Sequence, residues 1–170
     1  MKRILDMSVA AVGLLIASPI LLFFMLLVWM QDWRSPFYMA PRVARGGGTF
    51  RMVKLRSMVV NADKTGVSST AATDMRITKV GRLIRKFKLD ELTQLWNVLW
   101  GEMSLVGPRP QTRDTGAALY THEEMNLITV RPGITDFSSI VFSDEGQILA
   151  GKGDPDVAYN QLIRPWKSRM

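Results

Sequence analysis

The amino-acid sequence predicts a helix-rich α+β protein, in which an apolar N-terminal segment of residues 1–34 precedes one compact domain of residues 35–170. Two observations support the helices. Residues 7–30 carry no charged side chain, and residues 77–88 and 90–100 repeat their apolar side chains with helical spacing. A third observation supports a few short strands: a triple glycine at 46–48 lies between two short, mainly apolar runs, which indicates a hairpin or tight turn.

Composition excludes several kinds of chemistry. The chain has 170 residues, a formal net charge of +7 and no cysteine, so it can form no disulfide, thiolate metal site or catalytic thiol. A single histidine, His122, excludes a multi-histidine metal site. His122 stands beside two glutamates and is expected to be an exposed helix residue without a role. Carboxylates and basic side chains must therefore carry most of any chemistry.

Positive charge is concentrated in the middle of the chain. Residues 31–113 contain 15 Lys and Arg against 6 Asp and Glu, whereas residues 114–170 contain 5 against 8. Because this basic block directly follows the apolar segment, it is expected to attract phosphates, whether of lipid head groups, nucleotides or nucleic acid.

The uncharged segment from Met7 to Met30 is expected to lie in a membrane. At about 1.5 Å per helical residue, it is long enough for a hydrocarbon core of about 30 Å. It is also longer than the apolar core of a cleaved signal peptide. Trp29, Trp33 and Tyr38 follow as an aromatic belt at the water interface.

Two topologies remain open for this segment. Pro19 removes a backbone donor in its middle, and basic residues flank both of its ends: Lys2, Arg3, Arg34, Arg42 and Arg45. The positive-inside tendency would place both flanks in the cytoplasm, as in a re-entrant helix broken at Ser18-Pro19. The alternative is a kinked helix that crosses once, since membrane-spanning helices tolerate proline.

The remaining segments are predicted from their local patterns. Residues 61–73 are small and polar, which is typical of a loop. The helix expected over 77–88 carries five cations: Lys79, Arg82, Arg85, Lys86 and Lys88. The helix over 90–100 is expected to stop at Gly101. Residues 157–166 form a mildly amphipathic helix, in which Leu162, Ile163 and Trp166 suit a membrane surface.

Asp90 and Glu91 are the candidate catalytic residues. They begin a helix, whose N-terminus favours ionised carboxylates and bound phosphate, and they follow the five cations. Carboxylates with basic neighbours can bind Mg²⁺ together with phosphate. A carboxylate can also attack phosphorus to give an aspartyl phosphate. The structural alternative is a helix cap that pairs with Lys86 or Lys88.

Several ordered motifs resemble the bacterial sugar transferase family, small monotopic phosphoglycosyl transferases that begin glycan assembly on undecaprenyl phosphate. The resemblance covers nearly the whole chain, from Lys2-Arg3-Ile4-Leu5-Asp6 and Ser18-Pro19 through residues 50–58 (FRMVKLRSM), 74–78 and 81–85. Its most specific stretch is residues 88–110, KLDELTQLWNVLWGEMSLVGPRP, which is followed by RPGIT at 131–135.

The resemblance implies a re-entrant helix broken at Ser18-Pro19, in a bacterial inner-membrane protein whose catalytic domain faces the cytoplasm. It implies that Asp90 attacks the β-phosphate of a UDP-sugar, which releases UMP and leaves a covalent phosphosugar for transfer to undecaprenyl phosphate. Glu91 would help to bind Mg²⁺, with Asp90 close to the same ion. Phosphate or substrate contacts are implied for Lys54, Arg85, Arg109, Arg131 and Asp154, and a surface or structural ion pair is the alternative for each.

Other partners and functions also follow from these patterns. Membrane lipids, further copies of the chain and downstream glycosyl transferases are compatible partners, whereas nucleic acid is not expected. Residues 136–145, DFSSIVFSDE, depart from the Gly-rich segment containing Asn-Gly-Arg in many relatives, so the donor sugar cannot be copied from them. One competing function is a membrane-anchored glycosyl transferase that releases UDP. Another is a non-enzymatic binder of anionic lipid or nucleic acid through residues 79–88, which leaves Asp90 and Glu91 unexplained.

Overall fold

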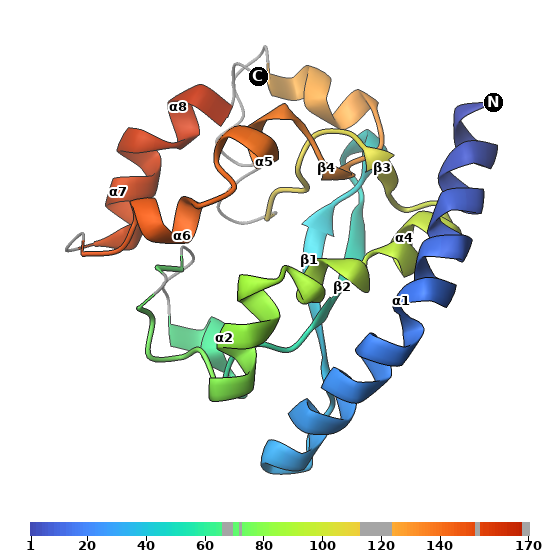
Figure 1. The fold of residues 1–170 in the computed structure, drawn as a ribbon. Helices are drawn as coiled ribbons and strands as arrows, with labels where there is room; N and C mark the ends of the chain where they lie inside the picture. Colours follow the sequence, from blue (N-terminus) through green and yellow to red (C-terminus); the bar gives the residue numbers. More distant parts are fainter. Residues whose placement is uncertain (66–69, 72, 113–123, 152–153, 168–170) are drawn as a thin grey trace. The chain divides into compact units, whose positions relative to one another are not determined.

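The computed structural model of the protein describes residues 1–65, 70–71, 73–112, 124–151 and 154–167; His122 and part of the expected 61–73 loop lie outside them. The chain divides into two compact units, Met1–Ser57 with Lys79–Asp136 and Met58–Thr78 with Phe137–Met170. Helices dominate and the strands are few and short (Figure 1), which confirms a helix-rich α+β fold. The boundary expected between residues 34 and 35 separates the membrane segment from the remaining domain, and it stays a prediction.

One long helix, α1 (Lys2–Asp32), begins the first unit and continues through Pro19. In an α-helix the N–H of residue 19 would pair with the carbonyl of residue 15, but proline has no N–H. The Ser18 hydroxyl donates instead to the Leu15 carbonyl oxygen at 2.8 Å. The Ser18-Pro19 pair therefore interrupts the backbone hydrogen bonds of α1, while the freed carbonyl keeps a partner.

Much of the apolar surface of α1 is exposed. Asp6, Ala10, Leu21, Phe24 and Val28 are buried, whereas large apolar side chains elsewhere on the helix are open to solvent, among them Leu15, Ile16, Leu22 and Phe23. Within the described residues, α1 is the one helix long and apolar enough to cross a membrane, and only 28% of its most apolar window is buried. An exposed apolar surface of this kind is typical of a membrane or protein contact.

The N-terminal end of α1 is held by polar contacts within the first unit. Arg3 donates to the carbonyl oxygens of Val98 at 2.5 Å and Leu99 at 3.0 Å. Ser104 donates its hydroxyl proton to the buried Asp6 carboxylate at 2.8 Å.

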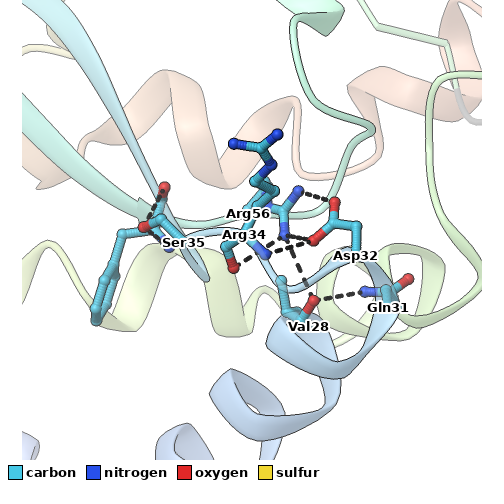
Figure 2. Close-up of polar contacts among 7 residues, drawn as sticks. Val28, Gln31, Asp32, Arg34, Ser35 and Arg56 are labelled. Carbon is cyan, nitrogen blue, oxygen red and sulfur yellow. Dashed lines mark hydrogen bonds and ion pairs between the residues drawn. The ribbon is translucent and has the colours of Figure 1, made fainter.

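The C-terminal end of α1 is held by Arg56 (Figure 2). Arg56 donates from both terminal nitrogens to the Asp32 carboxylate. It also approaches the Val28 and Arg34 carbonyl oxygens at 3.4 and 3.5 Å. The Val28 carbonyl lies one turn before the end of α1, so this contact extends the attachment beyond the ion pair at Asp32. Arg56 therefore acts as a C-terminal clamp on this helix.

Strands β1 (Phe37–Val43) and β2 (Thr49–Leu55) form an antiparallel hairpin, which confirms the hairpin expected at the triple glycine. Its turn is a short 3-10 helix, η1 (Arg45–Gly47). Gly46 and Gly47 have φ angles of 80° and 83°, which residues with a Cβ rarely adopt.

The free edge of β2 is closed by side chains from the helices that follow it. The fully buried Asn97 accepts from the Val53 N–H at 2.9 Å and donates to the Arg51 carbonyl at 2.8 Å. The Thr93 hydroxyl donates to the Val53 carbonyl at 3.1 Å. These side chains satisfy backbone groups that a third strand would otherwise pair, and they dock the helices onto β2.

Three helices follow the hairpin in the first unit: α2 (Lys79–Lys86), α3 (Leu89–Leu92) and α4 (Leu95–Trp100). The helices expected over 77–88 and 90–100 are therefore present, but the second is divided after Leu92. Gly101, with a φ of 92°, ends α4 as expected. Gly81 of α2 lies against the chain at Ser57, since a Cβ on Gly81 would lie 1.8 Å from the Ser57 carbonyl oxygen.

A short parallel pair, β3 (Ser104–Val106) and β4 (Gly133–Thr135), completes the sheet structure of this unit. A 3-10 helix, η4 (Glu124–Thr129), precedes β4. The backbones of Gly107 and Gly133 touch, because a Cβ on Gly133 would lie 2.2 Å from the Gly107 nitrogen. This close approach fixes the loop that carries Arg109.

In its described residues, the second unit contains a 3-10 helix and four short α-helices: η2 (Ala62–Thr65), α5 (Phe137–Val141), α6 (Glu145–Ile148), α7 (Pro155–Leu162) and α8 (Arg164–Lys167). Its buried apolar cluster includes Leu149, Ala158 and Ile163. The expectation that Ile163 faces a membrane surface is therefore wrong: its side chain is fully buried in this core, while Leu162 and Trp166 are exposed.

Candidate active site

Asp90 and Glu91 lie in the first turn of α3, as the sequence indicates. Lys88, just before this turn, has a φ of 52° and a ψ of 29°. A non-glycine residue in this left-handed region costs of order 1–3 kcal/mol and is typical of functional sites. The change of chain direction at Lys88 separates α2 from α3, and Arg85 in the last turn of α2 is close enough to Asp90 to lower its pKa.

Lys54 of β2 faces Asp90. Its Nζ lies 3.9 Å from Asp90 Oδ2, and the two side chains are 20% and 15% exposed. Thr93, one turn after Asp90, is hydrogen-bonded to the β2 backbone at Val53, the residue before Lys54. The contacts that dock α3 and α4 onto β2 therefore also set the distance between lysine and carboxylate. This distance exceeds that of a hydrogen bond, so the Asp90 oxygen stays available to a reacting group.

Arg109 forms the corresponding pair with Glu91. Its guanidinium nitrogen lies 3.7 Å from Glu91 Oε1. Arg109 belongs to the loop after β3, and its backbone N–H donates to the Asp136 carboxylate at 3.1 Å. Each of the two adjacent carboxylates thus has a cation from a different part of the fold beside it.

Burial dominates the electrostatics of Asp90. It raises the pKa of Asp90 above the ordinary value, and the neighbouring Glu91 raises it further. Lys54 and Arg85 oppose this change, because a nearby cation favours the ionised carboxylate. The sequence argument that the helix N-terminus keeps Asp90 ionised is therefore incomplete: desolvation has the larger effect, and the cations limit it.

Burial also lowers the pKa of Lys54, because removal from water disfavours the ammonium form. Asp90 and Glu91 act in the opposite direction, whereas Arg109 and Arg42 reinforce the decrease. The site is consequently a partly desolvated cluster in which each charge depends on the others.

The sequence that forms this site matches a known protein family. A model of the family described as bacterial sugar transferase matches residues 1–168. The chain is a member of the bacterial sugar transferase family. It is 41% identical over 134 residues to the "Putative undecaprenyl-phosphate N-acetylgalactosaminyl 1-phosphate transferase" of Bacillus subtilis strain 168, covering 79% of this chain and 70% of that protein.

Two further sugar transferase relatives are longer proteins. A UDP-N-acetylgalactosamine-undecaprenyl-phosphate N-acetylgalactosaminephosphotransferase of Aeromonas hydrophila is 36% identical over 146 residues, which cover 82% of this chain and 34% of the relative. An undecaprenyl-phosphate glucose phosphotransferase of Komagataeibacter xylinus is 39% identical over 147 residues, covering 82% and 27%. The chain therefore spans about a third or less of these two relatives.

In this sugar transferase, the structure brings together five of the residues singled out in the sequence: Lys54, Arg85, Asp90, Glu91 and Arg109.

Arg131, in the same unit, donates from Nε to the Gly101 carbonyl at 2.9 Å, just past the end of α4. Asp154 belongs to the second unit, where its carboxylate accepts from the Asp156 and Val157 N–H groups and caps α7. Substrate contacts for Arg131 and Asp154 stay predictions.

Arg42 is a site residue that the sequence did not single out. The hairpin register pairs Tyr38 with Lys54 and Arg42 with Phe50, so the side chains of Arg42 and Lys54 share a face. Burial lowers the pKa of Arg42, and the adjacent Arg109 lowers it further, whereas Tyr38 opposes the decrease. In the structure, Arg42 is two residues from the buried Ala40 and therefore lies on the inward face of the strand.

The donor set is compatible with one divalent cation. Within the described residues, no group of three or more His, Asp or Glu side chains could hold a metal. Mg²⁺ commonly needs only one or two carboxylates, because substrate phosphates and water complete its coordination. Asp90 and Glu91, adjacent in one turn and each beyond hydrogen-bond distance from its cation, fit this requirement.

Proposed function

We propose that this sugar transferase moves a sugar-1-phosphate from a UDP-sugar to polyprenol phosphate, namely undecaprenyl phosphate, and releases UMP. The observation that carries the proposal is the partly buried Asp90 carboxylate with Lys54 and Arg85 beside it. The names of the A. hydrophila and K. xylinus relatives support it, since both combine undecaprenyl phosphate with a sugar phosphotransferase activity.

The proposed reaction proceeds in two displacements at one phosphorus. An Asp90 carboxylate oxygen bonds to the β-phosphorus of the donor, and the bond from that phosphorus to the bridging oxygen breaks. The bridging oxygen keeps the electron pair and leaves as part of UMP, so the sugar phosphate remains on Asp90 as an acyl phosphate. An oxygen of polyprenol phosphate then attacks the same phosphorus and releases the Asp90 carboxylate.

This reaction suits a site of carboxylates and cations. Both attacking groups are already anionic oxygens, so neither displacement requires a proton to be removed. Lys54, Arg85 and Arg109 would instead neutralise the phosphate oxygens as charge moves from the nucleophile to the leaving group. Mg²⁺, held by Asp90 and Glu91, would add to this neutralisation.

The relatives do not identify the sugar that the donor carries. Their names specify N-acetylgalactosamine in A. hydrophila and glucose in K. xylinus, at similar identity to this chain. Family membership therefore supports a sugar-phosphate transferase without choosing the sugar. A panel of UDP-sugars is the appropriate donor set for a first experiment.

For the membrane, we propose that α1 is re-entrant and that both of its ends lie on the cytoplasmic side. The contacts of its two ends support this topology. Arg3 and Asp6 at one end and Asp32 at the other all bond to residues of the same compact unit. A helix that crossed the bilayer once would carry one end away from that unit. The Ser18-Pro19 interruption supplies a weak point for the required bend.

The decisive experiment follows nucleotide release. Purified protein in detergent receives undecaprenyl phosphate, Mg²⁺ and a panel of UDP-sugars, with Asp90→Asn as the test variant and Asp63→Asn as the control. Asp63 is an exposed carboxylate of η2. We expect UMP from the wild type and the control. Asp90→Asn should lose at least about 10³-fold in rate, as expected when the attacking group itself is removed.

Other outcomes would replace the proposal. Release of UDP would identify a glycosyl transferase that cleaves the sugar–phosphate bond, and full activity of Asp90→Asn would exclude covalent attack by Asp90. With acceptor omitted, intact-protein mass spectrometry should show the mass of one sugar phosphate on the wild type and none on Asp90→Asn. An unmodified wild-type protein that nevertheless releases UMP in the full assay would favour direct transfer.

A further inference from the structure

Among the described residues, no carboxylate forms an ion pair with Arg42 or acts on its charge. Lys54 and Arg85 act on Asp90, and Arg109 pairs with Glu91. The groups that act on the charge of Arg42, within the described part of the chain, are the Tyr38 phenol and the Arg109 guanidinium. Arg42 is therefore a half-buried cation next to another cation.

The Arg42 side chain is also left incomplete in its hydrogen bonding. Its Nε is buried and has no hydrogen-bond partner among the described residues. A buried N–H without a partner costs about 1–3 kcal/mol, and more when it belongs to a charged group. Proteins satisfy most buried polar atoms, so an N–H of this kind is compatible with a bound ligand that supplies the missing acceptor.

The charge of the whole cluster points to an anionic ligand. Arg42, Lys54, Arg85 and Arg109 are four formal cations, and Asp90 and Glu91 are two formal anions. Positive charge therefore exceeds negative charge in a partly desolvated site, even when the Asp136 carboxylate beside the Arg109 backbone is counted. A phosphate group can supply negative charge, and a guanidinium can bind it with two parallel hydrogen bonds.

The positions of the cations indicate which of them binds each of the two phosphates of the donor. Lys54 Nζ lies 3.9 Å from Asp90 Oδ2, so Lys54 belongs beside the phosphorus that Asp90 attacks. Arg109 pairs with Glu91 instead, and the hairpin register places Arg42 four residues along β1 from Tyr38, the partner of Lys54. In an in-line displacement the leaving group departs on the side opposite the nucleophile. The cation pair away from Asp90 therefore suits the leaving phosphate.

We propose that Arg42, together with Arg109, binds the nucleotide-side phosphate of the UDP-sugar and stabilises the departing UMP. This inference rests on the proposed function and extends it to a residue that completes the leaving-group site. Arg42 acts on the oxygen that receives the electron pair when the bond to the β-phosphorus breaks. Binding of that phosphate would relieve the repulsion between Arg42 and Arg109.

Binding of UMP tests the inference without requiring turnover. The dissociation constant of UMP would be measured with Mg²⁺ by calorimetry on the full chain in detergent. The variants are Arg42→Met, which removes the charge and the unpaired N–H, and Arg42→Lys, which keeps only the charge. Arg51→Met is the matched control, because Arg51 is an exposed arginine on the adjacent strand and faces the other side of the hairpin.

We expect Arg42→Met to weaken UMP binding about 10- to 100-fold, the range for a lost hydrogen bond to a charged group. Arg42→Lys should be intermediate, and Arg51→Met should match the wild type. The melting temperature of Arg42→Met should equal or exceed that of the wild type, because a buried N–H without a partner is removed. A purely structural arginine would show the reverse, with lower thermal stability and unchanged UMP affinity.

The outcomes separate this inference from the proposed function. Unchanged UMP affinity in Arg42→Met, or a decrease no larger than that in Arg51→Met, would overturn the role of Arg42 even if the wild type releases UMP. Wild-type release of UDP alone would overturn the proposed function itself. If Arg42→Met does not fold, Arg42→Lys carries the test, and wild-type UMP affinity in that variant would contradict the inference.

Discussion

Asp90 meets two requirements that oppose each other. A nucleophilic carboxylate must be ionised, yet a site that excludes water disfavours the charge, and burial raises the pKa of Asp90. Lys54 limits this change from 3.9 Å away without forming a hydrogen bond. At the scale of single residues, Lys54 therefore favours the ionised form of Asp90, the nucleophile of the proposed reaction.

The pH dependence of activity tests this relation. Wild-type kcat/KM for UMP release should rise with pH as Asp90 loses its proton, with the midpoint above the ordinary aspartate pKa of about 3.9. Lys54 lowers the pKa of Asp90, so Lys54→Met should move this rise to higher pH in addition to lowering the plateau. The exposed Lys64→Met serves as the control. A midpoint that stays in place or moves to lower pH in Lys54→Met would contradict the assignment.

The sequence identified the residues whose chemistry is evident from type and spacing. Asp90, Glu91 and Arg85 are close together along the chain, and the family motifs added Lys54 and Arg109. Arg42 was noted only as a cation flanking the membrane segment. Its role depends on the hairpin register and on Arg109, a residue distant in sequence, and no local pattern contains that information.

At the scale of elements, Asn97 joins α4 to the open edge of β2. Replacing it with leucine would leave the Val53 N–H and the Arg51 carbonyl without their partners. We expect Asn97→Leu to lower the free energy of unfolding by about 2–4 kcal/mol, because each buried group that loses its partner costs about 1–3 kcal/mol. Chemical denaturation in detergent measures this change. Asn160→Leu, an exposed helical position of α7, should have little effect; equal losses in both variants would refute the edge contact.

Gly81 positions α2, and thereby Arg85. A Cβ there would lie 1.8 Å from the Ser57 carbonyl oxygen, so α2 must shift if Gly81 becomes alanine. We expect Gly81→Ala to reduce kcat/KM for UMP release by about 10²-fold, the scale for an approximately 1 Å displacement of an active-site group. Gly48→Ala is the control, since a Cβ at Gly48 meets no atom within 4 Å. Wild-type activity in Gly81→Ala would show that Arg85 does not need this packing.

The helices show which features the sequence patterns predict and which they do not. Apolar spacing located the helices around 77–88 and 90–100, and glycine chemistry predicted the end at Gly101. The spacing did not reveal the left-handed backbone of Lys88 or the buried position of Ile163. Both depend on packing between segments, which overrides the preference of a lysine for ordinary backbone angles and of an amphipathic helix end for a surface.

For the whole molecule, the contacts at both ends of α1 support the proposed re-entrant topology over a single crossing. The N-terminal end is bonded to α4 and β3 through Arg3 and Asp6, and the C-terminal end is clamped by Arg56 (Figure 2). These contacts are compatible with each other only if both ends remain with the same compact unit. The re-entrant path satisfies them, whereas a single crossing would break one set. In the proposed re-entrant path, the Ser18 hydroxyl would reduce the cost of a bend, because it pairs with the Leu15 carbonyl that Pro19 leaves free.

An introduced thiol tests the topology directly, because the chain has no cysteine of its own. In intact cells, Lys2→Cys should resist a thiol reagent that cannot cross the inner membrane, and it should react after the cells are lysed. Straightening the helix with Ser18→Ala and Pro19→Ala in the same chain restores an N–H to pair with Leu15. This change favours a single crossing and should increase labelling of Cys at position 2 before lysis. Labelling of Lys2→Cys in intact cells without these changes would instead establish a single crossing in the native chain.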